Sequence, residues 1–144
     1  GAVHRYMGRI SGPLLDRIDL QVEVTPVTPA ELASAAPGEP SAAIRERVIR
    51  AREFQAERFR DVEGVHTNSM MNSRLLREYC RLDSASEALL QRAMEQLSLS
   101  ARAYDRILKV ARTIADLAGR REIAAADVAE AIGYRSLDRG TWGR

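Results

Sequence analysis

Arg17 is the residue whose surroundings most directly suggest chemistry. It lies between Asp16 and Asp19 in the stretch RISGPLLDRIDLQVEV, which starts at residue 9 and places a Gly-Pro pair before a strand-like end. A guanidinium group can form paired hydrogen bonds with a carboxylate or with a phosphate. Two interpretations follow from these residues. Arg17 pairs with a flanking aspartate at the surface, or it is held at an edge of the protein to meet an anionic group.

Other residues limit what the chain can do by itself. The single lysine, Lys109, has no glycine-rich loop before it, whereas a P-loop needs a lysine that reaches the β- and γ-phosphates of a nucleotide. The single cysteine, Cys80, excludes an internal disulfide, and with His4 and His66 it does not form a metal-ligand pattern. We therefore expect no metal site, and an isolated chain that neither binds nor hydrolyses ATP.

The composition is that of a globular protein. Hydrophobic residues make up 45% and charged residues 29% of the 144 residues, and the formal net charge of +2 is weak support for a nucleic-acid partner. No apolar run approaches the roughly 20 residues that cross a bilayer, and no signal-peptide core is visible. The expectation is a cytoplasmic protein with no membrane partner.

The chain divides into three zones. Residues 1–24 contain the Arg17 stretch and end in IDLQVEV, whose alternating apolar residues predict a strand over residues 18–24. Residues 25–40 hold four of the five prolines and predict a linker. Residues 41–144 have helical periodicity almost throughout. A lone strand cannot satisfy its backbone polar groups, so it is expected to join a sheet outside this chain.

Several helices are predicted in the third zone. A long helix begins with Ser41 as its N-cap and stops at Gly64. Ser84 and Glu87 match a capping box for a later helix. The clearest pattern follows Ser100 as N-cap and ends at Gly119. A short helix around residues 73–80 and a last helix in AAADVAEAIGYR complete a helical bundle.

In this order, the motifs resemble the C-terminal part of the magnesium-chelatase-like AAA+ ATPases, in particular the ComM/YifB group of bacterial proteins. The resemblance rests on RISGPLLDRIDLQVEV, the proline-rich linker, the long charged helix, LSARAYDRILKVARTIADLAG and AEAIGYRSLDR. Asn68 and Met70 also fit the group's pattern. Asp127 departs from it, because many relatives have a histidine there, and we expect that position to concern packing.

The resemblance implies a fold and two functional arginines. The expected fold is mainly α: a C-terminal AAA+ helical lid over residues 41–144, preceded by a strand-bearing remnant of the α/β ATPase core over residues 1–24. Arg17 would be a catalytic arginine finger that reaches the ATP site of the neighbouring subunit. Arg102 would be a sensor 2 arginine that contacts nucleotide phosphates, with Arg106 as a structural partner one turn later.

The same resemblance implies the surroundings in which the chain works. ATP and Mg²⁺ would be bound by the full-length protein. The partners would be the rest of the AAA+ core, the neighbouring subunits of a hexameric ring, and DNA, which the motor would remodel by branch migration. Whether Arg102 serves its own subunit or a neighbour stays open.

An alternative from another class is a free-standing helical module that binds DNA or protein. Its phosphate-binding stripe would consist of arginines on the long helix: Arg45, Arg47, Arg50, Arg52, Arg58 and Arg60. Four acidic residues are interleaved with these arginines, which favours a solvated helix face with local ion pairs.

Overall fold

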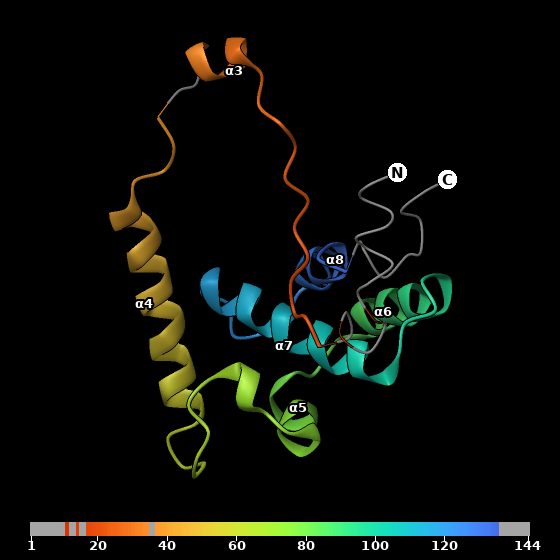
Figure 1. The fold of residues 1–144 in the computed structure, drawn as a ribbon. Helices are drawn as coiled ribbons and strands as arrows, with labels where there is room; N and C mark the ends of the chain where they lie inside the picture. The colour runs from red at the N-terminus through yellow and green to blue at the C-terminus, as the bar shows by residue number, and fades with distance from the viewer. Residues whose placement is uncertain (1–10, 12–13, 15–16, 35–36, 136–144) are drawn as a thin grey trace.

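A computed structural model describes residues 11, 14, 17–34 and 37–135. The described elements are helices, with no strand among those residues (Figure 1). In chain order they are α3 (Pro29–Ser34), α4 (Ser41–Arg58), the 3-10 helix η1 (Asn68–Met70), α5 (Ser73–Tyr79), α6 (Ser84–Gln96), α7 (Ala101–Leu117) and α8 (Ala125–Gly133). The predicted mainly helical fold, typical of a lid domain, is confirmed.

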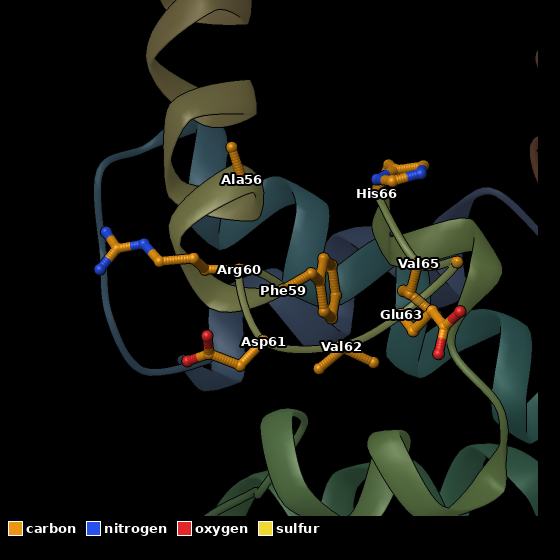
Figure 2. A pocket seen from close by; sticks show the side chains of 9 residues that line it. Ala56, Phe59, Arg60, Asp61, Val62, Glu63, Val65 and His66 are labelled. Carbon is orange, nitrogen blue, oxygen red and sulfur yellow. The ribbon is translucent and has the colours of Figure 1, made fainter.

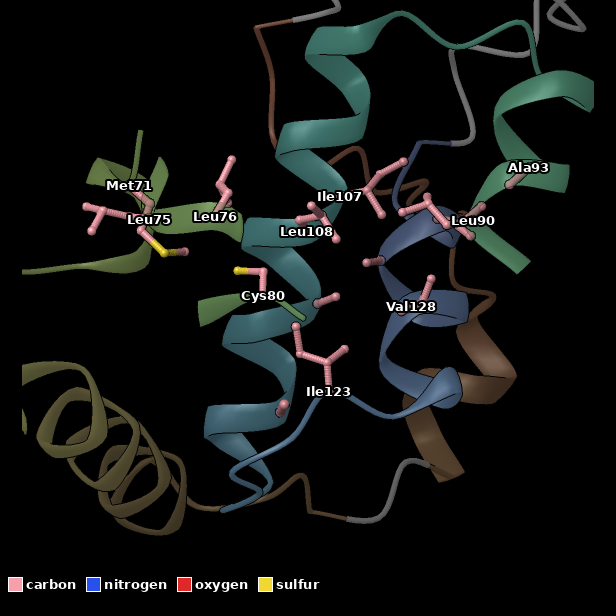
Figure 3. Close-up of a cluster of buried hydrophobic side chains, with 14 of the residues drawn as sticks. Met71, Leu75, Leu76, Cys80, Leu90, Ala93, Ile107, Leu108, Ile123 and Val128 are labelled. Carbon is pink, nitrogen blue, oxygen red and sulfur yellow. The ribbon is translucent and has the colours of Figure 1, made fainter. Parts of the chain in front are cut away.

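Helix α7 is the central element of the bundle. It packs against α4, α5 and α8, while α6 packs on α8. Its apolar residues recur at helical spacing, so Ile107, Ala111 and Ala115 are buried along one side. Figure 3 shows Leu108 on the side of α7 that faces Cys80 and the α5 region, while Val128 lies across from Ile107 on α8.

Local capping residues set the starts of α6 and α7, and the cap of α6 lies one residue before the predicted one. The Ser100 side chain accepts a hydrogen bond from the N–H of Ala103, at 3.2 Å, so the predicted N-cap of α7 is confirmed. The cap of α6 is Asp83 rather than Ser84, because the Asp83 carboxylate accepts from the N–H of Ser86 at 2.7 Å. This hydrogen bond lowers the pKa of Asp83. Gly119 has φ +71°, which lets the chain turn after α7.

Helix α4 is shorter than predicted. It ends at Arg58 rather than continuing to Gly64, and Ser41 is its first residue, with Pro40 at the N-cap position. Phe59 is buried and makes an edge-to-face ring contact with Tyr79, so the chain leaves the helical path where this ring enters the core. The first half of α4 extends beyond the bundle (Figure 1), and Val48 there remains 40% exposed.

The predicted strand and linker form an arch between the bundle and α4 (Figure 1). Residues 18–24 pair with no second strand among the described residues, so the predicted strand is not confirmed. Val22 and Val24 are 69% and 86% exposed. The proline-rich segment includes α3, a six-residue helix with no buried residue.

We expect the helical domain to fold without the first 40 residues. The hydrophobic core runs from Phe59 to Ile132, so a chain that starts at Ser41 keeps all of these core residues. Removing residues 1–40 should preserve the helical circular dichroism spectrum and a cooperative melt, with a loss of about 1–2 kcal/mol from the missing polar contacts. The 144-residue chain is the control, and an unfolded shortened chain would contradict this prediction.

Candidate functional site

Arg17 lies in an exposed turn near the start of the described chain. Its backbone N–H donates to the carbonyl of Leu14 at 3.0 Å, and its side chain makes no hydrogen bond or ion pair in the part of the chain that the structure describes. Asp16, one of the two aspartates considered as its partner, lies outside the described residues. The other, Asp19, pairs with Arg106 instead. The predicted alternative in which Arg17 pairs with Asp19 is therefore wrong for this structure.

Residues 17–21, which we call the docked segment, lie against the end of the helical bundle. Three contacts hold the segment in place. Arg106 of α7 pairs with the carboxylate of Asp19, and the guanidinium of Arg135 donates to the carbonyl oxygen of Ile18. The N–H of Gln21 donates to the carbonyl oxygen of Tyr134 at 2.9 Å. Two of these contacts fix the backbone of the segment rather than a side chain.

Arg102 lies in the first turn of α7. Its side chain is exposed and forms no hydrogen bond or ion pair with the described residues. The unpaired N–H groups and the dipole of a helix start favour nearby anions. Arg102 is therefore available to an anionic ligand.

Arg106 links the two candidate arginines. Residues four apart on a helix are neighbours on its surface, so Arg106 lies one turn along α7 from Arg102. Arg106 also pairs with Asp19, two residues after Arg17. The prediction that Arg106 is a structural partner is supported by this ion pair. The structure thus places the docked segment against the same helix that carries Arg102.

Sequence reasoning missed a buried polar network around Asp116. The Asp116 side chain is 1% exposed and accepts hydrogen bonds from Arg58, at 2.6 and 2.8 Å. It also accepts from Nε of Arg112 at 3.1 Å and from Nδ2 of Asn68 at 2.9 Å. One carboxylate therefore joins the end of α4, the helix η1 and α7.

The same network extends to the turn after α7. Arg112, with a 2% exposed side chain, donates to the carbonyl oxygens of Arg120 and Arg121, at 2.6 and 2.7 Å. Burial lowers the pKa of Arg112, and the nearby Asp116 carboxylate opposes that shift. Gln55 completes the network, because its side-chain oxygen accepts from the N–H of Asn68 at 2.9 Å. Asn68, which fits the pattern of the ComM/YifB group, therefore has a structural role in this buried network.

Asp127 has a structural role, as expected for its position in the last helix. Its carboxylate accepts from the N–H of Ala124 at 2.8 Å and pairs with Arg120. The side chain is 2% exposed. Asp127 therefore caps the start of α8 and joins that helix to the turn after α7.

Two of the pockets formed by the described residues have linings that include neither Arg17 nor Arg102. A pocket of about 510 Å³ follows the end of α4 and is lined by residues from Ala56 to His66. Figure 2 shows Arg60 extending away from the other labelled side chains of this pocket. A more apolar pocket of about 310 Å³ lies between the docked segment, α7 and α8, with Arg106 and Tyr134 in its wall.

Cys80 and His66, also considered for chemistry in the sequence, differ in their burial. Burial raises the pKa of the Cys80 thiol to about 12, so it stays protonated and unreactive at neutral pH. His66 is exposed, and His4 lies outside the described residues. No group of three or more acidic, histidine or cysteine side chains suited to a metal ion occurs among the residues described. In that same part of the chain, no helix has the length and apolar character needed to span a membrane.

The sequence of this chain matches two models of a known family. The family model described as magnesium chelatase, subunit ChlI C-terminal, matches residues 38–135, and the model for magnesium chelatase, subunit ChlI, matches residues 1–32. The chain therefore belongs to the magnesium chelatase ChlI family.

Similar proteins come from several bacteria. The chain is 43% identical to competence protein ComM of Haemophilus influenzae over 138 residues, which is 95% of this chain. It is 41% identical to the uncharacterized protein YifB of Escherichia coli over 94% of this chain. It is 44% identical to the uncharacterized protein Rv2897c of Mycobacterium tuberculosis over 91% of this chain. In each case the matched part is 26% of the relative. The chain thus spans about a quarter of the length of these proteins.

Proposed function

We propose that this chain is the C-terminal part of a magnesium-chelatase-like AAA+ ATPase. It supplies a trans arginine finger, Arg17, and a sensor 2 arginine, Arg102, in a helical lid. Together they couple ATP hydrolysis in a hexameric ring to remodelling of DNA in the cytoplasm. The observation that carries this proposal is the sequence match to the ChlI family models over residues 1–32 and 38–135. Arg17 and Arg102 lie within these ranges, and their side chains are exposed and unpaired among the described residues.

The charge and position of Arg17 fit the role of a finger. Phosphoryl transfer depends on positioning and on neutralising charge that develops on the γ-phosphate, and an arginine supplied for this purpose can raise the rate by about 10³- to 10⁵-fold. An arginine already paired with Asp19 would have to give up that partner first. Here Arg106 occupies Asp19 and leaves Arg17 free to cross a subunit interface.

This chain has residues suited to contact the phosphates of ATP, but not the motifs that bind a nucleotide and Mg²⁺. The exposed guanidinium groups of Arg17 and Arg102 suit phosphate oxygens. The sequence contains no P-loop, and the described residues offer no acidic cluster for Mg²⁺. We therefore assign the binding of nucleotide and metal to the rest of the full-length protein, and to this chain the contacts that respond to the bound phosphates.

DNA as the substrate rests on the resemblance to the ComM/YifB group. The alternative of a free-standing DNA-binding module is weaker, because two members of its arginine stripe are engaged elsewhere. Arg58 is turned inward to Asp116, and Arg47 pairs with Glu39. These contacts favour a helix that packs on its own domain over a continuous phosphate-binding face.

Arg102→Ala in the full-length protein tests the lid assignment. We expect the apparent KM for ATP to rise at least about tenfold, because one charge-assisted contact to phosphate is worth about 1.5–3 kcal/mol. Steady-state hydrolysis over a range of ATP concentrations measures this change. Arg121→Ala, an exposed arginine after α7, is the matched control. An unchanged KM and an unchanged kcat for Arg102→Ala would contradict the assignment.

A further inference from the structure

We propose that the contacts of the docked segment with α7 and α8 position Arg17, so that the lid of one subunit sets the arginine finger presented to its neighbour. Asp19, Arg106 and Arg135 would then be positioning residues for hydrolysis. This inference rests on the proposed function of Arg17 as a finger. It adds a physical link between the finger and the lid within one chain.

The first part of the link is the ion pair between Asp19 and Arg106. Asp19 lies two residues after Arg17, and Arg106 lies one turn after Arg102. The Asp19 side chain is 50% exposed and that of Arg106 29%. Solvent weakens such a pair, so its main effect is on where the segment lies rather than on overall stability.

The second part is the hold on the backbone. Arg135 is 1% exposed and reaches the carbonyl oxygen of Ile18, 117 residues earlier and directly after Arg17. The N–H of Gln21 bonds to the carbonyl oxygen of Tyr134, at the end of α8. Two backbone contacts three residues apart fix both the position and the direction of the segment. A buried arginine keeps one of these contacts in a fixed place.

Arg17 depends on this hold because its own side chain has no partner among the described residues. Its position therefore follows from the backbone next to it, which contacts Tyr134 and Arg135 directly after α8, while the nearby Asp19 side chain pairs with Arg106 of α7. Misplacing a group that stabilises a transition state by about 1 Å can lower the rate by about 100-fold. Any movement of α7 and α8 relative to the ATPase core would shift Arg17 in the same way.

The test uses the full-length protein and leaves Arg17 intact. Asp19→Asn should lower kcat about tenfold with little change in the KM for ATP, because the finger acts in the transition state. The double variant Asp19→Arg, Arg106→Asp should restore part of the rate by reversing the ion pair. Glu39→Gln is the matched control, because it removes an exposed ion pair with Arg47, away from the docked segment.

Mixed rings distinguish positioning of the finger from a defect in the subunit's own lid. A P-loop mutant has an intact finger, so mixing it with Asp19→Asn should recover activity at the Asp19→Asn subunits' own ATP sites. If Asp19→Asn lowers kcat but mixing does not restore it, the pair acts within its own subunit and the inference is wrong. If Asp19→Asn is fully active while Arg17→Ala is not, the finger stands and the inference fails. If both are fully active, the proposed function itself fails.

Discussion

Replacing Arg17 with alanine in the full-length protein should, under the proposed function, lower ATP hydrolysis at least about 100-fold, while ATP affinity and ring assembly stay close to those of the unmodified protein. The charge of a finger is needed mainly in the transition state, so its loss reduces kcat rather than ground-state binding. Steady-state hydrolysis, nucleotide titration and size measurement of the assembled ring give the three quantities separately. The exposed location of Arg17 makes loss of folding an unexpected outcome.

A control variant and a mixing experiment distinguish a role of Arg17 across the subunit interface from a general effect of removing an arginine. Arg50→Ala removes another exposed arginine, from α4, and should leave hydrolysis unchanged. Mixing Arg17→Ala with a P-loop mutant should restore part of the activity, because each supplies what the other lacks at a shared site. Normal hydrolysis by Arg17→Ala in assembled rings would show that this arginine is an ordinary surface charge.

Asp116→Ala should destabilise the helical domain by about 3–5 kcal/mol. The change removes the carboxylate that Arg58 and Arg112 share, and leaves cationic groups without their buried counter-charge. Since whole domains are stable by only about 5–15 kcal/mol, much of the folded population could be lost near physiological temperature. Urea unfolding of the 144-residue chain, followed by circular dichroism, measures the free energy of unfolding.

A matched variant separates this network from a general effect of charge on α7. Asp105→Ala removes a carboxylate from the same helix, where it has no hydrogen bond or ion pair among the described residues. It should change the free energy of unfolding by less than about 1 kcal/mol. If Asp116→Ala were as stable as Asp105→Ala, the network would not stabilise the fold.

Local sequence patterns predicted the helices better than their ends. The apolar spacing from Tyr104 to Ala118 identified α7, and Ser100 was the right cap, because both signals lie within the helix itself. The predicted N-cap of α6, Ser84, lies one residue after the observed N-cap, because Asp83 next to it is an equally good capping residue. The predicted end of α4, Gly64, lies six residues after the observed end, Arg58. Phe59, which follows the helix, packs in the core against Tyr79, and local periodicity does not encode that contact.

The surroundings of the candidate site depended on contacts that are distant in sequence. Arg58 and Asp116 are 58 residues apart, and Asp19 and Arg106 are 87 apart. No local pattern signals either pair, because helical spacing places Asp116 away from the apolar side of α7 that contains Ile107 and Ala111. The family resemblance predicted Arg17 and Arg102 as site residues from their positions in the motifs, whereas the three-dimensional arrangement was needed to show which arginines are already paired.

The burial of Cys80 makes this chain convenient for spectroscopy. Cys80 is the single cysteine of the sequence, it is 4% exposed, and its pKa is raised to about 12. Labelling with a maleimide or a thiol-reactive nitroxide requires the cysteine thiolate to attack the reagent, so buried, protonated Cys80 should stay unlabelled while the domain is folded. A cysteine introduced at an exposed position, as in Arg102→Cys, would then carry a fluorophore or spin label at one defined point without prior removal of the native thiol.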